Sequence, residues 1–324
     1  MTPPRVELMV VGTPRSGTTL VQRLAVESCE LRGAPETNYF SLFPRLLSHE
    51  GPRHVPRTRD HLIRALLAYS RSPLLEGTQL RTDAVLALLD GRLVDVYDIF
   101  EAVTATLAGG PDRLCEKTPG HLWWWDRIAA ARPAMRFVML VRDPRAVIAS
   151  LMEARFAHQS LADYVEWWRH DQRLVEGARR QLLSRCLVLR YEDVVSDEQR
   201  ARRALQTLCH RDGPSPSGNG PSMDGGPSLA LPWETWKTGY DGPVTTDRVE
   251  SWRDRLSARE AAFIVRATSR EMRHWGYATG AESEAVVELP GRQRGRRLVK
   301  RGRLVAFRHR QRHLLAQTVD LRQP

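Results

Sequence analysis

The chain has very little lysine, little cysteine and no long apolar run. Only three of its 49 strong cations are lysines, namely Lys117, Lys237 and Lys300, and arginine supplies the rest. A lysine kept against such a bias indicates a need for a compact point charge with a titratable amine. No apolar stretch approaches the roughly 20 residues that cross a bilayer. The first one, residues 8–11, is too short for the core of a signal peptide, so we expect a cytoplasmic protein.

The cysteines are too few and too far apart to form a disulfide framework or a metal site. The four are Cys29, Cys115, Cys186 and Cys209, with no CxxC pair and no histidine at ligand spacing. We therefore expect reduced, mostly buried thiols and no metal.

The net charge of +11 is concentrated near the C-terminus. Residues 289–324 hold eleven arginines and lysines against one acid, a net of +10, which leaves +1 for residues 1–288. We predict one domain over residues 1–288 and a basic tail over residues 289–324, and we expect no specific nucleic-acid partner. The tail interleaves apolar and cationic residues. It fits an amphipathic helix with weak contact to an anionic membrane or acidic partner, or equally a solvated appendage.

Strand patterns alternate with helical ones along the first 275 residues. Continuous apolar runs predict strands, and 3.6-residue periodicity predicts helices. The predicted strands are 6–11, 31–32, 113–116, 136–141 and 186–191, and the clearest helices begin near Thr18 or span 161–183 and 257–275. We interpret residues 44–110 as a helical insertion and the Gly-, Pro- and Ser-rich residues 212–232 as a flexible loop. The alternation predicts an α/β fold with a mostly parallel central sheet.

The segment after the first predicted strand has the spacing of a phosphate-binding loop. Residues 12–19 match the pattern GxxxxGK[ST] except that Thr18 stands where the lysine belongs. The glycines let backbone N–H groups converge on an anion, and the following helix adds its dipole. Arg15 is placed to supply the missing cation. A kinase would need that lysine and an acidic residue for Mg²⁺, and the best candidate, Asp143, is already explained as a helix cap.

This loop resembles the 5′-phosphosulfate loop of sulfotransferases that use 3′-phosphoadenosine 5′-phosphosulfate. It is closer to the bacterial and tyrosylprotein branch, which favours arginine here, than to the cytosolic small-molecule branch, which favours lysine. The resemblance covers roughly residues 6–277 and implies a P-loop-type parallel sheet flanked by helices. The nucleotide contacts that it implies are Pro14, Arg15, Ser16, Gly17, Thr18 and Thr19.

A second motif resembles the part of this family that binds the 3′ phosphate. Arg142 ends a predicted strand and Ser150 follows eight residues later. A guanidinium fork at a helix N-terminus together with a hydroxyl suits an anion. Lys237 and the run at residues 245–256 resemble, more loosely, the segment that closes over the nucleotide.

Three residues are candidates for the chemistry besides Arg15. Glu36 follows Arg15 by 21 residues, where the tyrosylprotein branch carries its catalytic base in a Glu-Thr pair. Lys117 resembles a lysine near the bridging oxygen of the donor, whose implied role is to stabilise the departing phosphate. The cytosolic branch has a catalytic histidine two residues after this lysine, where this sequence has Pro119. His121 is therefore the alternative base.

Two tryptophan clusters allow two interpretations. Residues 123–125 and 167–168 either line an aromatic acceptor pocket or pack helices against the sheet, and the second is favoured.

The sequence thus predicts a sulfotransferase domain that moves a sulfuryl group from the nucleotide donor to a hydroxyl of a small-molecule acceptor. Glu36 is the expected general base, adenosine 3′,5′-bisphosphate the expected product, and no metal takes part. The lack of a leader or anchor favours a small acceptor, as in specialised metabolism, over a secreted protein. The alternatives are a P-loop nucleotide kinase and a nucleotide-binding module whose basic tail contacts nucleic acid or a membrane. The oligomeric state is not indicated.

Overall fold

The computed structural model describes most of the chain. The described residues are 3–50, 57–78, 80–154, 159–209, 228–230, 234, 241–279 and 318–322. Lys237, most of the loop predicted at residues 212–232 and most of the predicted tail lie outside this set. Across the described residues, no helix combines the length and the apolar composition that a bilayer-spanning segment requires.

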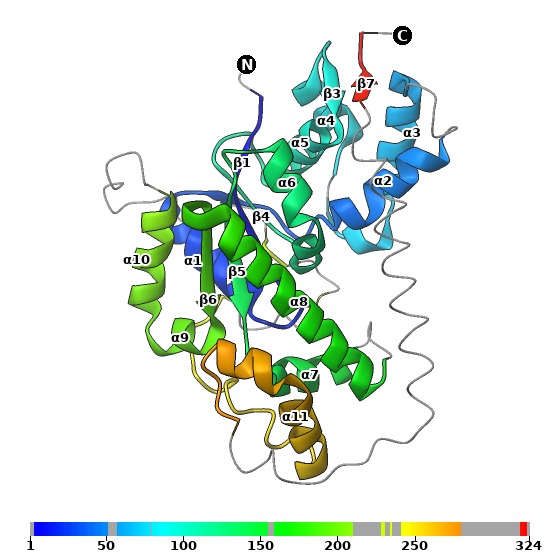
Figure 1. Ribbon diagram of the computed structural model, residues 1–324. Helices are drawn as coiled ribbons and strands as arrows, with labels where there is room; N and C mark the ends of the chain where they lie inside the picture. Colours follow the sequence, from blue (N-terminus) through cyan, green and yellow to red (C-terminus); the bar gives the residue numbers. More distant parts are fainter. Residues whose placement is uncertain are drawn as a thin grey trace.

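A five-stranded parallel sheet forms the centre of the fold (Figure 1). Its strands are β1 (Val6–Gly12), β2 (Arg32–Gly33), β4 (Leu114–Lys117), β5 (Arg136–Val141) and β6 (Cys186–Arg190). In space they follow the order β2-β4-β1-β5-β6. The order reverses at β1, so the loops after β1, β4 and β5 meet at the edge where such sheets bind ligands. The predicted parallel α/β sheet is confirmed.

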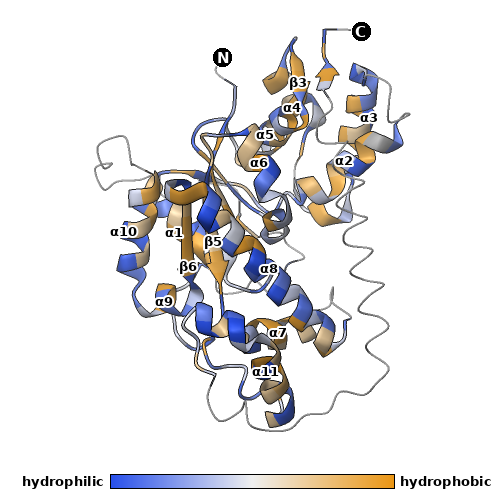
Figure 2. Cartoon of the chain, in the orientation of Figure 1, coloured by the Kyte–Doolittle hydropathy of each residue, from blue (hydrophilic) through white to orange (hydrophobic). Residues whose placement is uncertain are grey.

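The two faces of the sheet bury different side chains because successive residues of a strand point to opposite sides. In β1, Leu8 and Val10 join an apolar cluster with α1 (Thr18–Cys29) and α10 (Glu198–Cys209). Met9 and Val11 belong to the larger core on the other face. A strand covered on both faces is apolar along its buried part, as in β5, which is buried from Phe137 to Val141 and mostly hydrophobic in Figure 2.

The helices that contribute to the larger core come from several parts of the chain. They include α6 (Trp125–Ala131), α7 (Pro144–Met152), α8 (Leu161–Leu182) and α11 (Ala258–His274). The short helix α9 (Tyr191–Ser196) directly follows β6. Single 3-10 turns lie at Pro73–Leu75 (η1), Pro119–Trp124 (η2) and Leu183–Arg185 (η3).

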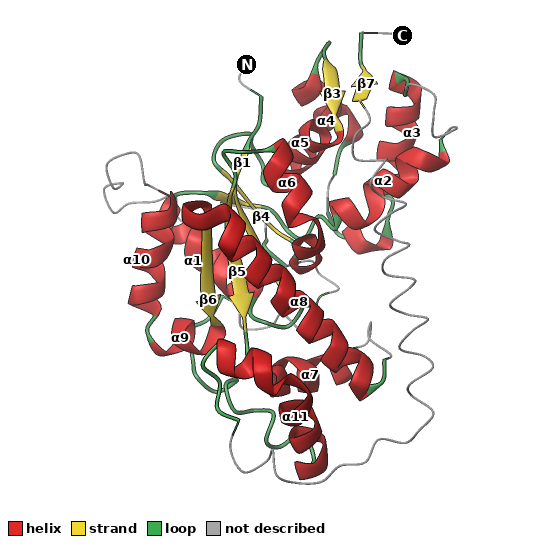
Figure 3. Ribbon diagram, in the orientation of Figure 1, coloured by secondary structure: helices red, strands yellow, loops and turns green. Residues whose placement is uncertain are grey.

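The region between β2 and β4 is mainly helical, as the predicted insertion requires (Figure 3). It contains α2 (Tyr39–His49), α3 (Arg59–Ser70), α4 (Thr82–Leu89), β3 (Leu93–Asp95) and α5 (Val96–Leu107). The helical part begins at Tyr39, earlier than the predicted residue 44, with Pro44 inside α2. The strand β3 was not predicted.

A second unpredicted strand lies within the segment predicted as a basic tail. This strand, β7 (Thr318–Asp320), pairs antiparallel with β3, and Val319 is fully buried opposite Val94. The end of the described chain therefore packs onto the helical insertion (Figure 1).

Several predicted boundaries agree with the structure to within two residues. The strand predicted at 136–141 is β5, and the helix predicted at 161–183 is α8. The helix predicted to begin near Thr18 is α1. These elements have long apolar runs or strong periodicity, which local sequence patterns detect best.

Candidate active site

The loop between β1 and α1 has the backbone shape of an anion-binding loop. Gly17 is the N-cap of α1 with a φ of 96°, and no side chain caps this helix. Arg15 also has a positive φ, 74°. The first N–H groups of α1 are therefore available to an anion, which the helix dipole favours. The hydroxyl of Ser16 is buried and has no hydrogen-bond partner among the described residues. Because buried polar groups are normally hydrogen-bonded, a bound ligand would supply the partner that this hydroxyl lacks.

Gly17 has no space for a side chain, which makes a first prediction possible. A Cβ at this position would lie 2.5 Å from Cδ2 of Tyr191, at a φ that L-residues rarely adopt. Backbone strain of about 1–2 kcal/mol and overpacking of about 1–3 kcal/mol should add in Gly17→Ala. We expect its melting temperature to fall by several degrees in calorimetry.

Two other glycines separate these causes. Gly91 has a positive φ but open space around its Cα, so Gly91→Ala tests backbone strain alone. Gly120 has neither a positive φ nor a close neighbour, so Gly120→Ala is the control. Gly17→Ala should be the least stable of the three, and equal melting temperatures for Gly17→Ala and Gly120→Ala would contradict the steric account.

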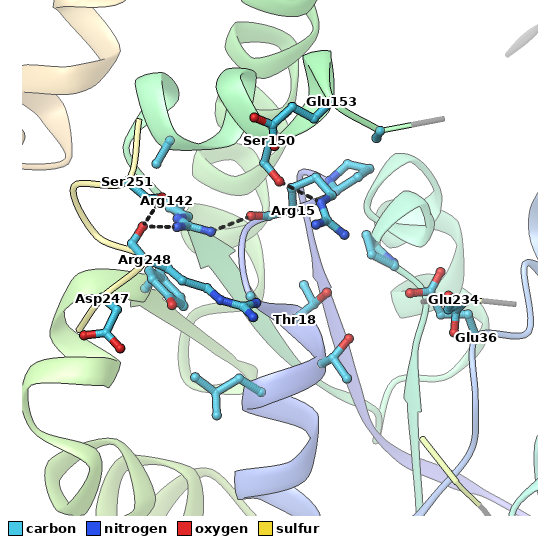
Figure 4. Close-up of a pocket in the computed structure, with 18 of the residues that line it drawn as sticks. Arg15, Thr18, Glu36, Arg142, Ser150, Glu153, Glu234, Asp247, Arg248 and Ser251 are labelled. Atoms are coloured by element: carbon cyan, nitrogen blue, oxygen red, sulfur yellow. Dashed lines mark hydrogen bonds between the residues drawn. The ribbon is translucent and has the colours of Figure 1, made fainter. Parts of the chain in front are cut away.

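Two arginines from different elements meet beside this loop. Nε of Arg15 donates to the hydroxyl of Ser150 at 2.9 Å, and Arg142 donates to the carbonyl of Arg15 at 3.0 Å. Arg142 also donates to the carbonyl of Arg248 at 2.5 Å, and its guanidinium lies 4.1 Å from the ring centre of Tyr191. Figure 4 shows this series of hydrogen bonds from Ser150 to Arg248. Predicted contacts from two motifs are thus brought together at one place.

The buried arginines of this cluster repel one another. Burial lowers the pKa of Arg15, and the charges of Arg142 and Arg248 lower it further. Burial also lowers the pKa of Arg142, whose Nε is buried without a hydrogen-bond partner among the described residues. Arginine remains charged under such conditions. A bound anion would therefore relieve both the mutual repulsion and the unpaired donor.

A cavity of about 940 Å³ connects these arginines with the end of β4. Its wall comes from the loop after β1, the start of α1, the loop after β2, the turn after β4, one side of α7 with the residues that follow it, and residues within 242–255. The cavity is large enough for a nucleotide-sized ligand, since ligand pockets typically enclose about 300–1,000 Å³.

Glu36 and Lys117 form an ion pair at the edge of this cavity. Nζ of Lys117 donates to Oε1 of Glu36 at 2.7 Å. Lys117 is fully buried and is not among the described residues that line the cavity, whereas the side chain of Glu36 is 17% exposed and lines it, so Lys117 reaches the cavity through Glu36. The two meet because β2 and β4 are parallel neighbours, with Gly33 opposite Cys115, so the residues that follow each strand emerge side by side. The two residues predicted for the chemistry are in direct contact.

His121, the alternative base, lies behind this pair and not in the cavity wall. The imidazole is fully buried, with Nδ1 3.1 Å from Oε2 of Glu116. Its Nε2 accepts the backbone N–H of Phe40 at 3.3 Å. Both ring nitrogens are therefore occupied, which leaves none to take a proton from an acceptor in this arrangement.

Some lining residues were not predicted. Arg248 lies in the loosely matched run 245–256 and was not singled out, although its carbonyl accepts from Arg142. Tyr191 was predicted only as the last residue of the strand at 186–191, yet its ring lies against the guanidinium of Arg142 and lines the cavity. Arg248 is one of 46 arginines, so nothing local in the sequence marks it as a site residue. Tyr191 follows a strand, where an aromatic residue usually belongs to the core. Lys237 lies outside the described residues, so its predicted contact stays a prediction.

The tryptophan clusters pack against the core, as favoured from the sequence. Trp124, Trp125 and Trp168 are buried, and Nε1 of Trp168 donates to the carbonyl of Arg142 at 3.1 Å. None of the five tryptophans at residues 123–125 and 167–168 contributes to the described wall of the cavity.

Comparison with known proteins places this chain in a family. The sequence matches the sulfotransferase family over residues 7–212, which is more than half of the chain. No curated protein matches it. Among solved structures, the fold is similar to a sulfotransferase domain from the curacin biosynthetic pathway, with a TM-score of 0.55 at 16% identity over 86% of this chain and 99% of that one.

A sulfotransferase domain from the olefin synthase of Synechococcus PCC 7002 is also similar. The TM-score is 0.50 at 18% identity, over 86% of this chain and 97% of that one. At such low identity these structures show the fold, and the family match shows the membership. The matches do not single out the tyrosylprotein branch. The chain belongs to the sulfotransferase family.

Proposed function

We propose that this sulfotransferase transfers the sulfuryl group of 3′-phosphoadenosine 5′-phosphosulfate to the hydroxyl of a small-molecule acceptor. One observation carries the proposal: a single cavity joins the loop and arginine cluster to the Glu36–Lys117 pair. The first end suits a nucleotide with two anionic groups, and the second suits proton transfer. The acceptor has to reach a recessed, partly buried carboxylate, which favours a small or slender molecule.

The residues at the arginine end fit the donor nucleotide. The N–H groups of residues 17–19, the Ser16 hydroxyl and the Arg15 side chain would hold the 5′ phosphosulfate. Arg142 and Ser150 would hold the 3′ phosphate. The unpartnered Ser16 hydroxyl and Arg142 Nε support this assignment, since buried polar groups are normally satisfied.

Glu36 and Lys117 would divide the chemistry between them. As the acceptor oxygen forms its bond to sulfur, Glu36 takes the proton of that hydroxyl. The bond between sulfur and the bridging oxygen of the donor breaks, and the electron pair stays on the leaving phosphate, which Lys117 stabilises. The products are a sulfate ester and adenosine 3′,5′-bisphosphate. Ion pairing with Lys117 keeps the carboxylate charged before the proton arrives.

The kinase alternative lacks support at the position where it would need an acid. Asp143 accepts the backbone N–H of Arg145 at 2.8 Å as the cap of α7, and it pairs with the side chain of Arg145 at 2.7 Å. This carboxylate is therefore occupied. Among the described residues, no group of three or more potential ligands is arranged to hold a metal ion. The partners proposed for the tail fall on residues mainly outside the described set and stay predictions.

A thermal-shift comparison tests the proposed donor. Adenosine 3′,5′-bisphosphate should raise the melting temperature, by an amount that grows with its concentration as mass action requires. ATP with Mg²⁺ should raise it much less, because it lacks the 3′ phosphate that Arg142 and Ser150 would bind. The opposite ranking would favour the kinase.

A further inference from the structure

We infer that Glu116 is a positioning residue, whose buried carboxylate aligns Glu36 with Lys117. This inference rests on the proposed function, because it concerns how the proposed base and cation are brought together. Glu116 touches neither the cavity nor, by its placement, any substrate.

Three donors surround the carboxylate of Glu116. The hydroxyls of Thr37 and Thr118 donate to Oε1 at 2.8 Å and 2.6 Å, and Nδ1 of His121 lies 3.1 Å from Oε2. Glu116 is fully buried. A buried carboxylate is costly unless it is hydrogen-bonded, and these contacts meet that requirement.

The same three groups bind the start of α2. Thr118 Oγ1 accepts the N–H of Asn38 at 3.2 Å, Thr37 Oγ1 accepts that of Tyr39 at 3.3 Å, and His121 Nε2 accepts that of Phe40 at 3.3 Å. The side chain of the N-cap residue, Asn38, does not cap α2 by a hydrogen bond. Glu116 therefore provides, through three intermediaries, the capping that this helix N-terminus needs and a negative charge that its dipole favours.

The network joins the two segments that carry the chemistry. Thr37 directly follows Glu36, and Lys117 lies between Glu116 and Thr118. Successive strand residues point to opposite sides, so fixing Glu116 on one side of β4 fixes the direction of Lys117 on the other. A shift of either segment would separate the carboxylate of Glu36 from Nζ of Lys117, which now lie 2.7 Å apart.

Glu116 carries its charge at neutral pH. Burial by itself would raise the pKa of Glu116, but the neighbouring His121 and the hydroxyl hydrogen bonds outweigh it and hold this pKa below its ordinary value. The group therefore acts as an acceptor only, which is what the three donors require. His121 gains a role here as a structural link between Glu116 and the backbone of α2.

The test is a double-substitution cycle in which kcat is measured at saturating radiolabelled donor, with benzyl alcohol or phenol as the hydroxyl probe. Glu116→Gln keeps the size of the side chain but removes its charge and one acceptor. We expect kcat to fall about 10²-fold, as for a misplacement of the reacting groups on the order of 1 Å. Stabilisation by adenosine 3′,5′-bisphosphate should be unchanged.

Combination with Glu36→Gln shows whether Glu116 acts through Glu36. If it does, the double variant should be no slower than Glu36→Gln alone, because residues that act as a unit are not additive. Multiplied losses, or a Glu116→Gln enzyme with wild-type kcat, would overturn the positioning role while leaving the proposed function intact. Wild-type turnover by Glu36→Gln itself would overturn both.

Two further variants guard against simple misfolding. Glu101→Gln alters a carboxylate that is equally buried and also accepts three hydrogen bonds, from Arg5, Val6 and Arg132, away from the cavity. It should lose stability but keep kcat. Thr37→Val should slow turnover as Glu116→Gln does, because it removes the hydroxyl that donates to Glu116. Thr37→Ser keeps this hydroxyl and should have a kcat close to that of the wild type. Equal rates for these two Thr37 variants would also overturn the inference.

Discussion

Replacing Glu36 by glutamine is expected to lower kcat by about 10²–10⁴-fold, the usual contribution of a general base. The amide has the same shape but cannot take the proton of the acceptor hydroxyl. Its oxygen can still accept from Lys117, so the geometry at the end of β4 should persist. The rate is measured as sulfate-ester formation from radiolabelled donor with benzyl alcohol, at saturating donor.

The choice of acceptor supplies the control for Glu36. Para-nitrophenol is largely ionised at mildly alkaline pH and needs little help to lose its proton, so the same substitution should cost far less with it. Stabilisation by adenosine 3′,5′-bisphosphate should stay close to that of the wild type, because the substitution keeps the shape of the side chain and leaves the proposed phosphate contacts Arg15, Arg142 and Ser150 in place. A loss of equal size with both acceptors would argue that Glu36 acts on something other than the proton.

Lys117→Met should lower kcat by about 10²–10³-fold, which is typical for removal of one preorganised charge donor from a site. The ammonium is fully buried and lies 2.7 Å from Glu36, so no water replaces it easily. Methionine fills a similar volume without charge. The loss should be greatest with donors that have a poor leaving group, which single-turnover rates can show.

Lys117→Arg distinguishes this account from a general need for positive charge. The planar guanidinium is larger and does not fit a site built for a compact ammonium. We therefore expect it to recover little of the lost rate. Recovery to near wild-type kcat would mean that charge near Glu36 is enough, without the specific placement of Nζ.

The central sheet could be predicted from the sequence because its signals are local. The apolar run at residues 136–141 and the glycines of residues 12–17 mark their elements without any knowledge of neighbours. The strands β3 and β7 could not be found in this way. Each has three residues, and each is stable only because the other lies beside it. The two are far apart in the sequence, since Leu93 pairs with Asp320, so no local pattern marks either of them.

The candidate site was predicted in its parts but not in its contacts. The resemblance to sulfotransferases indicated Glu36 and Lys117 separately, and the parallel register of β2 and β4 explains why they touch. Glu116 gave no signal, since one acidic residue in a short strand resembles an exposed edge position. Its importance depends on Thr37, Thr118 and His121 gathering around it, which only the folded chain shows.

The pairing of β3 with β7 also affects the order in which the chain can fold during its synthesis. All five strands of the main sheet have left the ribosome once Arg190 and the following stretch have been made, and domains fold from the N-terminal side during translation. At that stage β3 still presents an unpaired edge, which is a template for association with other chains. Val94, fully buried in the finished fold, has no strand opposite it until residues 318–320 emerge. The nascent chain is therefore exposed to aggregation through β3 in the interval between the completion of the main sheet and the emergence of residues 318–320.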